Sequence, residues 1–346
     1  MQTHATRPDP HRRQRGAALI GIAGLAALGL GATLVHGFGN TPEADAVSEW
    51  NRIGIDAGAA LERGTSEQRE LTMMHLAIHD ALHSIRPVYA SYVAPTRMHP
   101  DALPDAAIAT AAHDVLVATV PMKRTALDTS YNDALARLPA GAPRDEGVRA
   151  GHEAASAIID KRAHDRSDAA DIAWDGKPGI GQWETTPPNH LKALLPGWRF
   201  VTPFAIHAAD QFLPPPPPAL DSAEYARQYA AVKGLGGQTT TSRTDDQGEI
   251  ARFWAGNVND AWNEIARKTI AANAPKRRDE LATWRNARTF ALLNMAMADG
   301  FVSGWNAKDH YHDGRPVTAI PRGDADGNPA TVPDAGWTSY LPTPEH

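Results

Sequence analysis

Cysteine is absent from the 346 residues of this chain. Its absence excludes disulfide bonds, thiolate nucleophiles and metal sites with cysteine ligands, and it is neutral about the cellular compartment. A surplus of basic residues is also missing, because 34 Lys and Arg stand against 40 Asp and Glu, for a formal net charge of −6. A protein that binds nucleic acid typically carries a basic face. We therefore expect no nucleic-acid partner.

The sequence also has no convincing run of alternating apolar and polar residues, and no internal repeat. Apolar residues make up 42% of the chain, which is enough for a packed core. Their spacing of three and four positions predicts helices instead of strands. We predict an all-α helical bundle in which 285–305, apolar on nearly every face, is central. The clearest predicted helices are 70–85, 104–120, 147–162, 258–273 and 285–305.

The N-terminus predicts export. Four arginines precede an uncharged run at 16–35, GAALIGIAGLAALGLGATLV, and a small-x-small site follows at 44–46. Together these features are typical of an export signal, so we predict an exported, periplasmic or extracellular protein with a signal at 1–46. The apolar run is also near the ~20 residues that span a bilayer. An uncleaved membrane anchor is therefore the alternative.

Three further parts follow the predicted signal. Residues 47–213 form an N-terminal helical part that includes a long loop at 174–203, where Gly, Pro, Trp and Asn interrupt the helical pattern. A proline-rich spacer at 214–221 begins with five consecutive prolines, which favour a stiff polyproline conformation. Residues 222–346 are a second helical part.

Two cations in this second part are candidates for an anion site. Lys308 and Arg315 are seven positions apart, and Pro316 forces Arg315 out of helical geometry. A tetrahedral oxyanion such as phosphate or vanadate needs converging donors, and arginine offers a planar fork while lysine offers a movable point charge. The pair would therefore supply about half of the donors that an oxyanion site needs. Two solvated cations in a loop rich in His and Asp are the alternative reading.

These residues carry a resemblance to a known family. Lysine, six residues and then Arg-Pro resembles the first of three motifs in the superfamily of vanadium-dependent haloperoxidases and type 2 phosphatidic acid phosphatases. The lead-in FALLNMAMADGFVSGWNAK and the run RPVTAI are similar to the bacterial haloperoxidase-like branch. MMHLAIHDALHSIRPVY and GDADGNPATVPDAGWTSYLPTP extend the similarity over most of 47–346. One departure is local, because His312, Asp313 and Gly314 stand where aromatic residues are expected.

The resemblance implies a function and names its residues. It makes Lys308 and Arg315 oxyanion ligands, with Lys308 also polarising bound peroxide, and gives Trp305 the role of a pocket wall. Vanadate is the implied cofactor of a haloperoxidase that acts on peroxide and halide. The alternative is a phosphatase that binds phosphate and hydrolyses a phosphate ester. The second motif, Pro-Ser-Gly-His, and the third, which contains an arginine and a histidine, are not found in this sequence, so we expect a truncated chain with very low turnover.

The sequence also allows a metal site on one helix and a role without catalysis. His75, His79 and His83 lie four positions apart on one predicted helix and could share a metal, although helix packing is the simpler role. We therefore predict no metal site. A non-catalytic exported helical binding module is the third functional hypothesis. If apolar helix faces such as those of 285–305 are uncovered, we also expect self-association.

Overall fold

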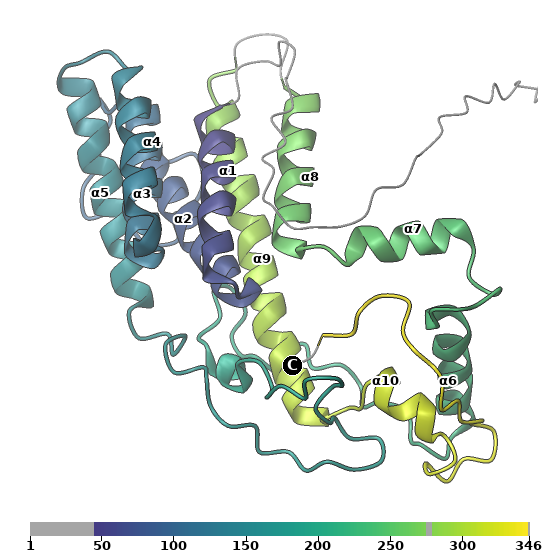
Figure 1. Cartoon of the computed structure of the whole chain (residues 1–346). Coiled ribbons are helices and arrows are strands. Elements are labelled where there is room, and N and C mark those ends of the chain that lie inside the picture. The colour runs from purple at the N-terminus through teal and green to yellow at the C-terminus, as the bar shows by residue number, and fades with distance from the viewer. Residues whose placement is uncertain (1–44, 275–278, 345–346) are drawn as a thin grey trace, which may run out of the picture. The chain divides into compact units, whose positions relative to one another are not determined.

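The computed structural model describes residues 45–274 and 279–344, and these are helical without a named strand. Two isolated bridges, Gln182 with Asp313 and Gly237 with Ser339, are the β-type pairings among the described residues. Short 3₁₀ segments occur at Ala59–Leu61, Pro121–Lys123, Pro196–Phe200 and Ile320–Arg322. The all-α prediction is therefore confirmed. The helices, labelled in Figure 1, are α1 (Ala46–Gly58), α2 (Gly64–Ile85), α3 (Pro104–Thr119), α4 (Arg124–Ala136), α5 (Ala142–Arg162), α6 (Ala223–Gly236), α7 (Asp245–Trp254), α8 (Val258–Ala272), α9 (Ala282–Tyr311) and α10 (Pro316–Ala319).

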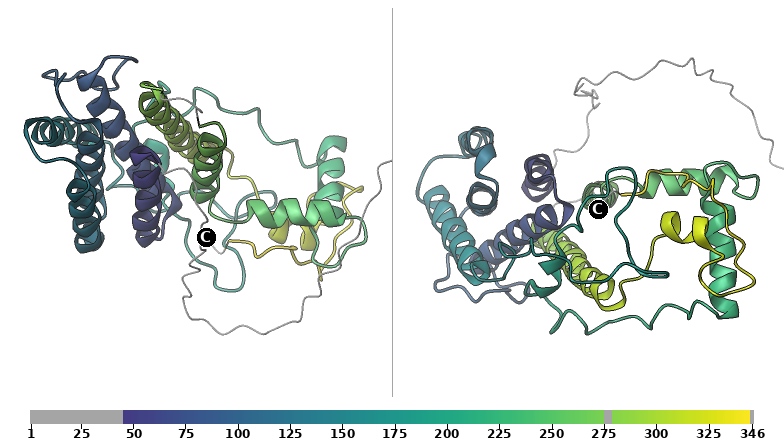
Figure 2. Two further views of the ribbon diagram at one scale, coloured as in Figure 1. Left: turned by 90° about the horizontal axis from the view of Figure 1, so that it is seen from above. Right: turned by 60° about the horizontal axis from the view of Figure 1, so that its bottom comes forward.

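The largest hydrophobic core lies among α1, α2, α3, α5 and the first half of α9. These helices run alongside one another in Figure 1, and both views of Figure 2 keep them together. Helix α2 is at the centre, because it packs against α1, α3, α5 and α9. Trp50, Leu71, Met74 and Phe290 are all at most 1% exposed in this core.

Small residues bring α3 and α5 into close contact. A Cβ atom added to Gly151 would lie 2.6 Å from Cβ of Thr110 and 2.7 Å from the carbonyl oxygen of Ala107. A Cβ atom at Gly147 would lie 2.5 Å from the carbonyl oxygen of Leu103. Real side chains do not tolerate such distances to backbone atoms. Glycine at these two positions therefore sets how closely the two helices approach.

The predicted helices exist, with differences at their ends. Helix α2 ends at Ile85 as predicted, because Arg86 adopts the extended conformation that a residue before proline requires. Helix α5 begins five residues earlier than predicted, directly after Gly141 at φ 133°, with Pro143 in its first turn, where proline is tolerated. The predicted loop 174–203 contains one short helical segment, Pro196–Phe200.

Helix α9 corrects one prediction. It runs for 30 residues to Tyr311, so Lys308 lies inside its last turns and not beyond its end. Its buried residues lie between Ala287 and Val302, and Leu292 in the same stretch is 44% exposed. The segment 285–305, predicted to be central because it is apolar on nearly every face, packs against α1, α2 and α8 but leaves Leu292 exposed. Many residues of this segment are small, such as alanine, and these can face solvent at little cost.

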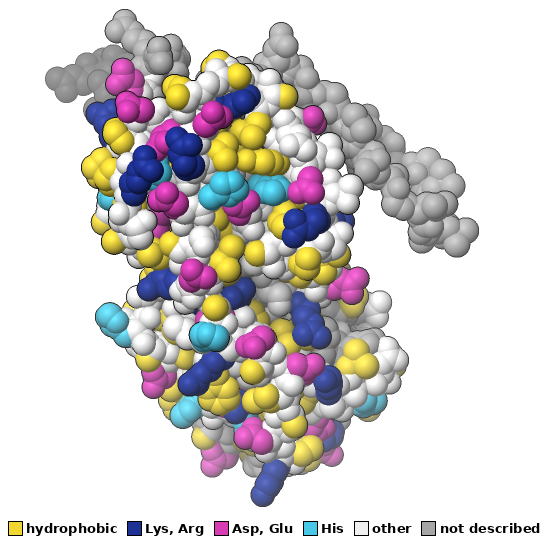
Figure 3. Space-filling view, turned by 90° about the vertical axis from the view of Figure 1, so that its left-hand side faces the viewer, with side chains coloured by type: hydrophobic (Ala, Val, Ile, Leu, Met, Phe, Trp, Pro, Cys, Tyr) yellow, Lys and Arg dark blue, Asp and Glu magenta, His cyan; other side chains and the backbone are white. Residues whose placement is uncertain are grey.

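Two observations bear on partners and surroundings. On the face drawn in Figure 3, acidic, basic and apolar side chains are interspersed, without a patch of one sign. No helix within 45–274 and 279–344 is both long and apolar enough to cross a membrane. The predicted signal or anchor at 1–46 lies outside the described residues except for Asp45 and Ala46. Asp45 caps α1, with its Oδ1 accepting the backbone N–H of Ser48 at 3.2 Å.

Candidate oxyanion site

The end of α9 and the start of α10 bring Lys308 and Arg315 together. Helix α9 stops because His312 adopts the left-handed conformation, with φ 50°. Arg315 is the extended residue before α10, and Pro316 occupies the first position of that helix. The chain therefore turns back between the two cations. The two cations are close enough for the positive charge of Arg315 to lower the pKa of Lys308.

Lys308 is held against an aromatic ring. Its ammonium nitrogen lies 4.1 Å from the ring centroid of Trp305, a cation–π contact. The indole N–H of Trp305 donates to the carbonyl oxygen of Leu194 at 3.0 Å, which fixes the ring. Burial lowers the pKa of Lys308, and the nearby positive charge of Arg315 lowers it further. An anion at this position would relieve both effects.

Arg315 is oriented by the long loop. Its guanidinium donates to Oγ1 of Thr186 at 2.7 Å and also contacts the carbonyl oxygen of Pro344. Thr186 is fully buried, so this hydroxyl is a fixed partner and not a surface contact. Burial lowers the pKa of Arg315, although the group stays charged at any ordinary pH.

The loop at 174–203 forms one wall of the site, which the sequence did not predict. The backbone N–H of Trp183 donates to the carbonyl oxygen of His312 at 2.6 Å, and that of Gly314 donates to Gly181 at 3.0 Å. Arg322 and Glu184 form an ion pair at 2.9 Å that ties the loop to the segment after α10. These contacts hold the turn between the two cations in place.

Aromatic side chains from the same loop stand near the local departure from the family motif. The ring centroids of Trp174 and Trp183 are 4.7 Å apart, and that of Trp174 is 5.5 Å from His312. His310, the other histidine between the two cations, packs edge-on against Tyr311. Trp174, more than a hundred positions earlier in the chain, therefore packs beside His312 at this departure from the motif.

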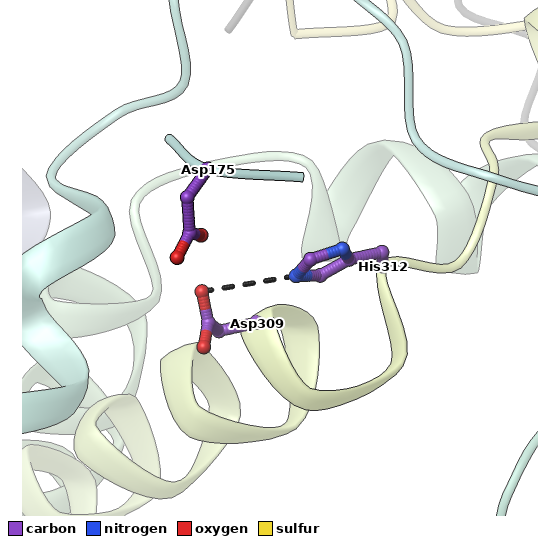
Figure 4. A group of neighbouring side chains, drawn as sticks. All are labelled: Asp175, Asp309 and His312. Atoms are coloured by element: carbon purple, nitrogen blue, oxygen red, sulfur yellow. Dashed lines mark ion pairs between the residues drawn. The ribbon is translucent and has the colours of Figure 1, made fainter. Parts of the chain in front are cut away.

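A group with metal-ligand chemistry lies beside this wall. Figure 4 shows Asp175 from the loop together with Asp309 and His312 from the end of α9. Their ligand atoms lie within 4.8 Å of one another, and His312 Nε2 is 3.9 Å from Asp309 Oδ1. The guanidinium of Arg199 contacts Asp309 and lies 4.0 Å from Asp175. Arg199 therefore forms ion pairs with both carboxylates, and the arrangement is best described as an ion-pair network.

The three histidines of α2 have separate partners. The side-chain amide of Asn51 donates to Nε2 of buried His75 at 2.7 Å, His79 pairs with Asp80 at 3.2 Å, and His83 Nδ1 donates to the carbonyl oxygen of Tyr89 at 2.6 Å. They do not converge on a common point. The helix-packing interpretation of these residues is the one that the structure supports.

Comparisons with known proteins bear on the fold and on the C-terminal part of the chain. Residues 288–346 match a family model described as the VCPO second helical-bundle domain. A solved structure described as the first bacterial vanadium-dependent iodoperoxidase matches with a TM-score of 0.65 and 19% sequence identity, over 86% of this chain and 75% of that chain. A search of curated proteins found no match. At this identity the structural likeness establishes the fold. The family-model match confirms the superfamily resemblance over 288–346, and the structural match confirms the fold.

Proposed function

We propose, on the premise that this chain is a relative of the vanadium-dependent haloperoxidases, that Lys308 and Arg315 bind a tetrahedral oxyanion, with vanadate as the intended ligand. The observation that carries the proposal is that Lys308, whose ammonium group lies over Trp305, and the partly buried Arg315 meet at one turn, close enough for the charge of Arg315 to lower the pKa of Lys308. Among the described residues, Lys308 takes part in no ion pair with a carboxylate. An incoming anion would interact favourably with both positive charges.

The residues present fit vanadate through their chemistry. Arg315 offers a planar set of donors fixed by Thr186, and Lys308 offers a point charge backed by Trp305. Bound vanadate would supply activation of peroxide for the oxidation of halide. The chain's own contribution is then to hold the oxyanion and to place positive charge beside it. Trp305 excludes water from one side of the ammonium group.

Magnitudes limit what these two residues achieve alone. A charge-assisted hydrogen bond contributes about 1.5–3 kcal/mol, so two contribute roughly 3–6 kcal/mol before ordering costs. That corresponds to dissociation constants in about the millimolar range. We therefore expect weak vanadate binding and very low bromide or iodide oxidation by the 346-residue polypeptide. Export through 1–46 is part of the same proposal and rests on the sequence.

Titration with vanadate, followed by ⁵¹V NMR, tests the proposal. Lys308→Ala and Arg315→Ala should each weaken binding roughly 10- to 100-fold, the equivalent of one charge-assisted contact. Lys161→Ala is the matched control, because Lys161 also lies over an aromatic ring, 5.5 Å from the centroid of Tyr92, but on a different part of the molecule. Equal vanadate affinity in the wild type, Lys308→Ala and Arg315→Ala would contradict the proposal and favour the non-catalytic module.

The dependence of vanadate affinity on pH gives a second measurement. The pKa of Lys308 is lowered, so its positive charge is lost at a lower pH than that of an ordinary lysine. Affinity should therefore fall as the pH rises through this lowered value. Lys308→Arg should remove that fall, because arginine stays protonated. Phosphate in place of vanadate should follow the same trend, since the two anions share tetrahedral geometry and charge.

A further inference from the structure

A second candidate site is a pocket between the turn that contains Asp313, Gly314 and Pro316 and the segments packed against this turn. Its volume is about 150 Å³. One side consists of the end of the proline-rich spacer and of α6, and the other side consists of the turn and α10. Tyr229 and Ile320 at its base are 7% and 1% exposed, so the pocket reaches into a buried cluster.

The walls of this pocket are mainly apolar and fixed. Leu220, Tyr225 and Val232 line one side, and Ala319 lines the other. The hydroxyl of Tyr229 already donates to the carbonyl oxygens of Ile320 and Val332, at 2.9 and 3.0 Å, so its ring is held as part of the wall. The two prolines that end the polyproline run, Pro217 and Pro218, also lie at the pocket. Stiff backbone and bonded side chains leave the cavity preformed.

One charged side chain lies among the lining residues, and it is an acid. Asp313 is at the rim, where burial raises the pKa of its carboxyl group. A carboxylate accepts hydrogen bonds and repels other anions. Gln228, also at the pocket, adds an amide that can donate or accept. The polar end of a ligand is therefore expected to be a hydrogen-bond donor and not an anion.

We propose that this pocket binds a monocyclic aromatic alcohol, with the ring among Leu220, Tyr225, Val232 and Ala319 and the hydroxyl donating to Asp313. An apolar cavity of ~150 Å³ holds one benzene-sized ring, which matches the observed volume. Aromatic walls favour an aromatic ligand through edge-to-face contacts. Because Asp313, Gly314 and Pro316 of the pocket lining belong to the turn that bears Arg315, this inference rests on the proposed function and names its class of organic substrate.

Binding of 4-fluorophenol, followed by ¹⁹F NMR on the full chain without vanadate, tests this inference. We expect saturable binding that is stronger for 4-fluorophenol than for 4-fluoroanisole, which has no hydroxyl donor, and weaker still for 4-fluorobenzoate. Ala319→Phe should reduce the affinity for 4-fluorophenol at least 10-fold by filling the cavity. Ala255→Phe is the matched control, since Ala255 is exposed at the end of α7 and lies outside the pocket.

The role of the acid is tested separately. Asp313→Asn should reduce the preference for the phenol over the anisole about 3- to 10-fold, whereas Asp221→Asn, an exposed acid next to the pocket lining, should leave the preference unchanged. Val232→Trp is a second cavity-filling variant, for use if Ala319→Phe fails to fold. Wild-type affinity in a folded cavity-filling variant, or no saturable binding by the wild type, overturns the inference. The titration contains no vanadate, so a failure of the oxyanion proposal would not affect its outcome.

Discussion

The helices of the first half of the chain and those of the second half bury very different shares of their residues. Helix α2 buries 16 of its 22 residues, whereas α6 buries only Tyr229 and α7 only Gly248. Burial of apolar area is the dominant stabilising term in folding. We conclude that the first half holds most of the stability and that the candidate site is built on the second half, where the chain is less constrained.

The largest expected effect tests the stability of the first half. Gly151→Leu would force a side chain into the contact between α3 and α5, where a Cβ atom alone would lie 2.6 Å from Thr110. Overpacking of this kind costs about 1–3 kcal/mol or more, and here it meets backbone atoms that cannot move aside. We expect the free energy of unfolding, measured by urea denaturation, to fall by at least about 3 kcal/mol.

A glycine in the second half of α9 is the matched control. No atom lies within 4 Å of the position where a Cβ would be added to Gly300. Gly300→Ala should therefore stabilise the chain by about 0.5–1 kcal/mol, because alanine has the higher helix propensity. Equal losses of stability at Gly151 and Gly300 would contradict the difference between the two halves.

A smaller effect comes from His75, in the same core. Burial lowers its pKa to about 3, with a further contribution from the charge of Arg267. Since the unfolded chain binds a proton near its ordinary pKa of ~6.5, stability from this residue is present above that pH and is lost as the pH falls toward the folded value. Between about pH 6.5 and about pH 5 the loss should be about 2 kcal/mol.

His75→Phe should remove this part of the acid sensitivity. The phenyl ring keeps the stacking on Phe290, whose centroid is 4.9 Å from that of His75, and cannot titrate. Asn51 would lose one hydrogen bond but keep its bond to Asn263 at 2.8 Å. Urea denaturation of both proteins at several pH values measures the difference. Parallel pH profiles for the wild type and the variant would rule out a neutral, buried His75.

The sequence predicted the structure better in the first half of the chain than in the second half. Helices α2, α3 and α5 of the first half were predicted because apolar spacing reports burial directly, whereas α1 and α4 were not predicted. Lys308 and Arg315 were found because their spacing is local. Thr186 was missed because it meets Arg315 across 129 positions, from a loop without periodicity. The pocket was missed for a similar reason, since the polyproline run was interpreted only as a spacer.

The smallest expected effect on stability concerns aromatic residues on the surface of α7 and α8. The ring of Trp254 contacts those of Phe253 and Trp262, and the exposures of Phe253, Trp254 and Trp262 are 58%, 44% and 43%. Clustered exposed apolar groups favour association. Phe253→Ser should change the free energy of unfolding by less than about 0.5 kcal/mol and should reduce self-association in sedimentation velocity experiments.

The matched variant for this last prediction is Leu292→Ser on α9. Leu292 is 44% exposed, close to the value for Trp254, but it lies on the helix whose apolar faces were expected from the sequence to drive association. A single exposed leucine is an ordinary surface feature. Leu292→Ser should therefore leave the sedimentation coefficient distribution as it is in the wild type. If Leu292→Ser, and not Phe253→Ser, abolishes association, then the uncovered apolar surface belongs to α9 and the contrast between the two halves does not extend to their surfaces.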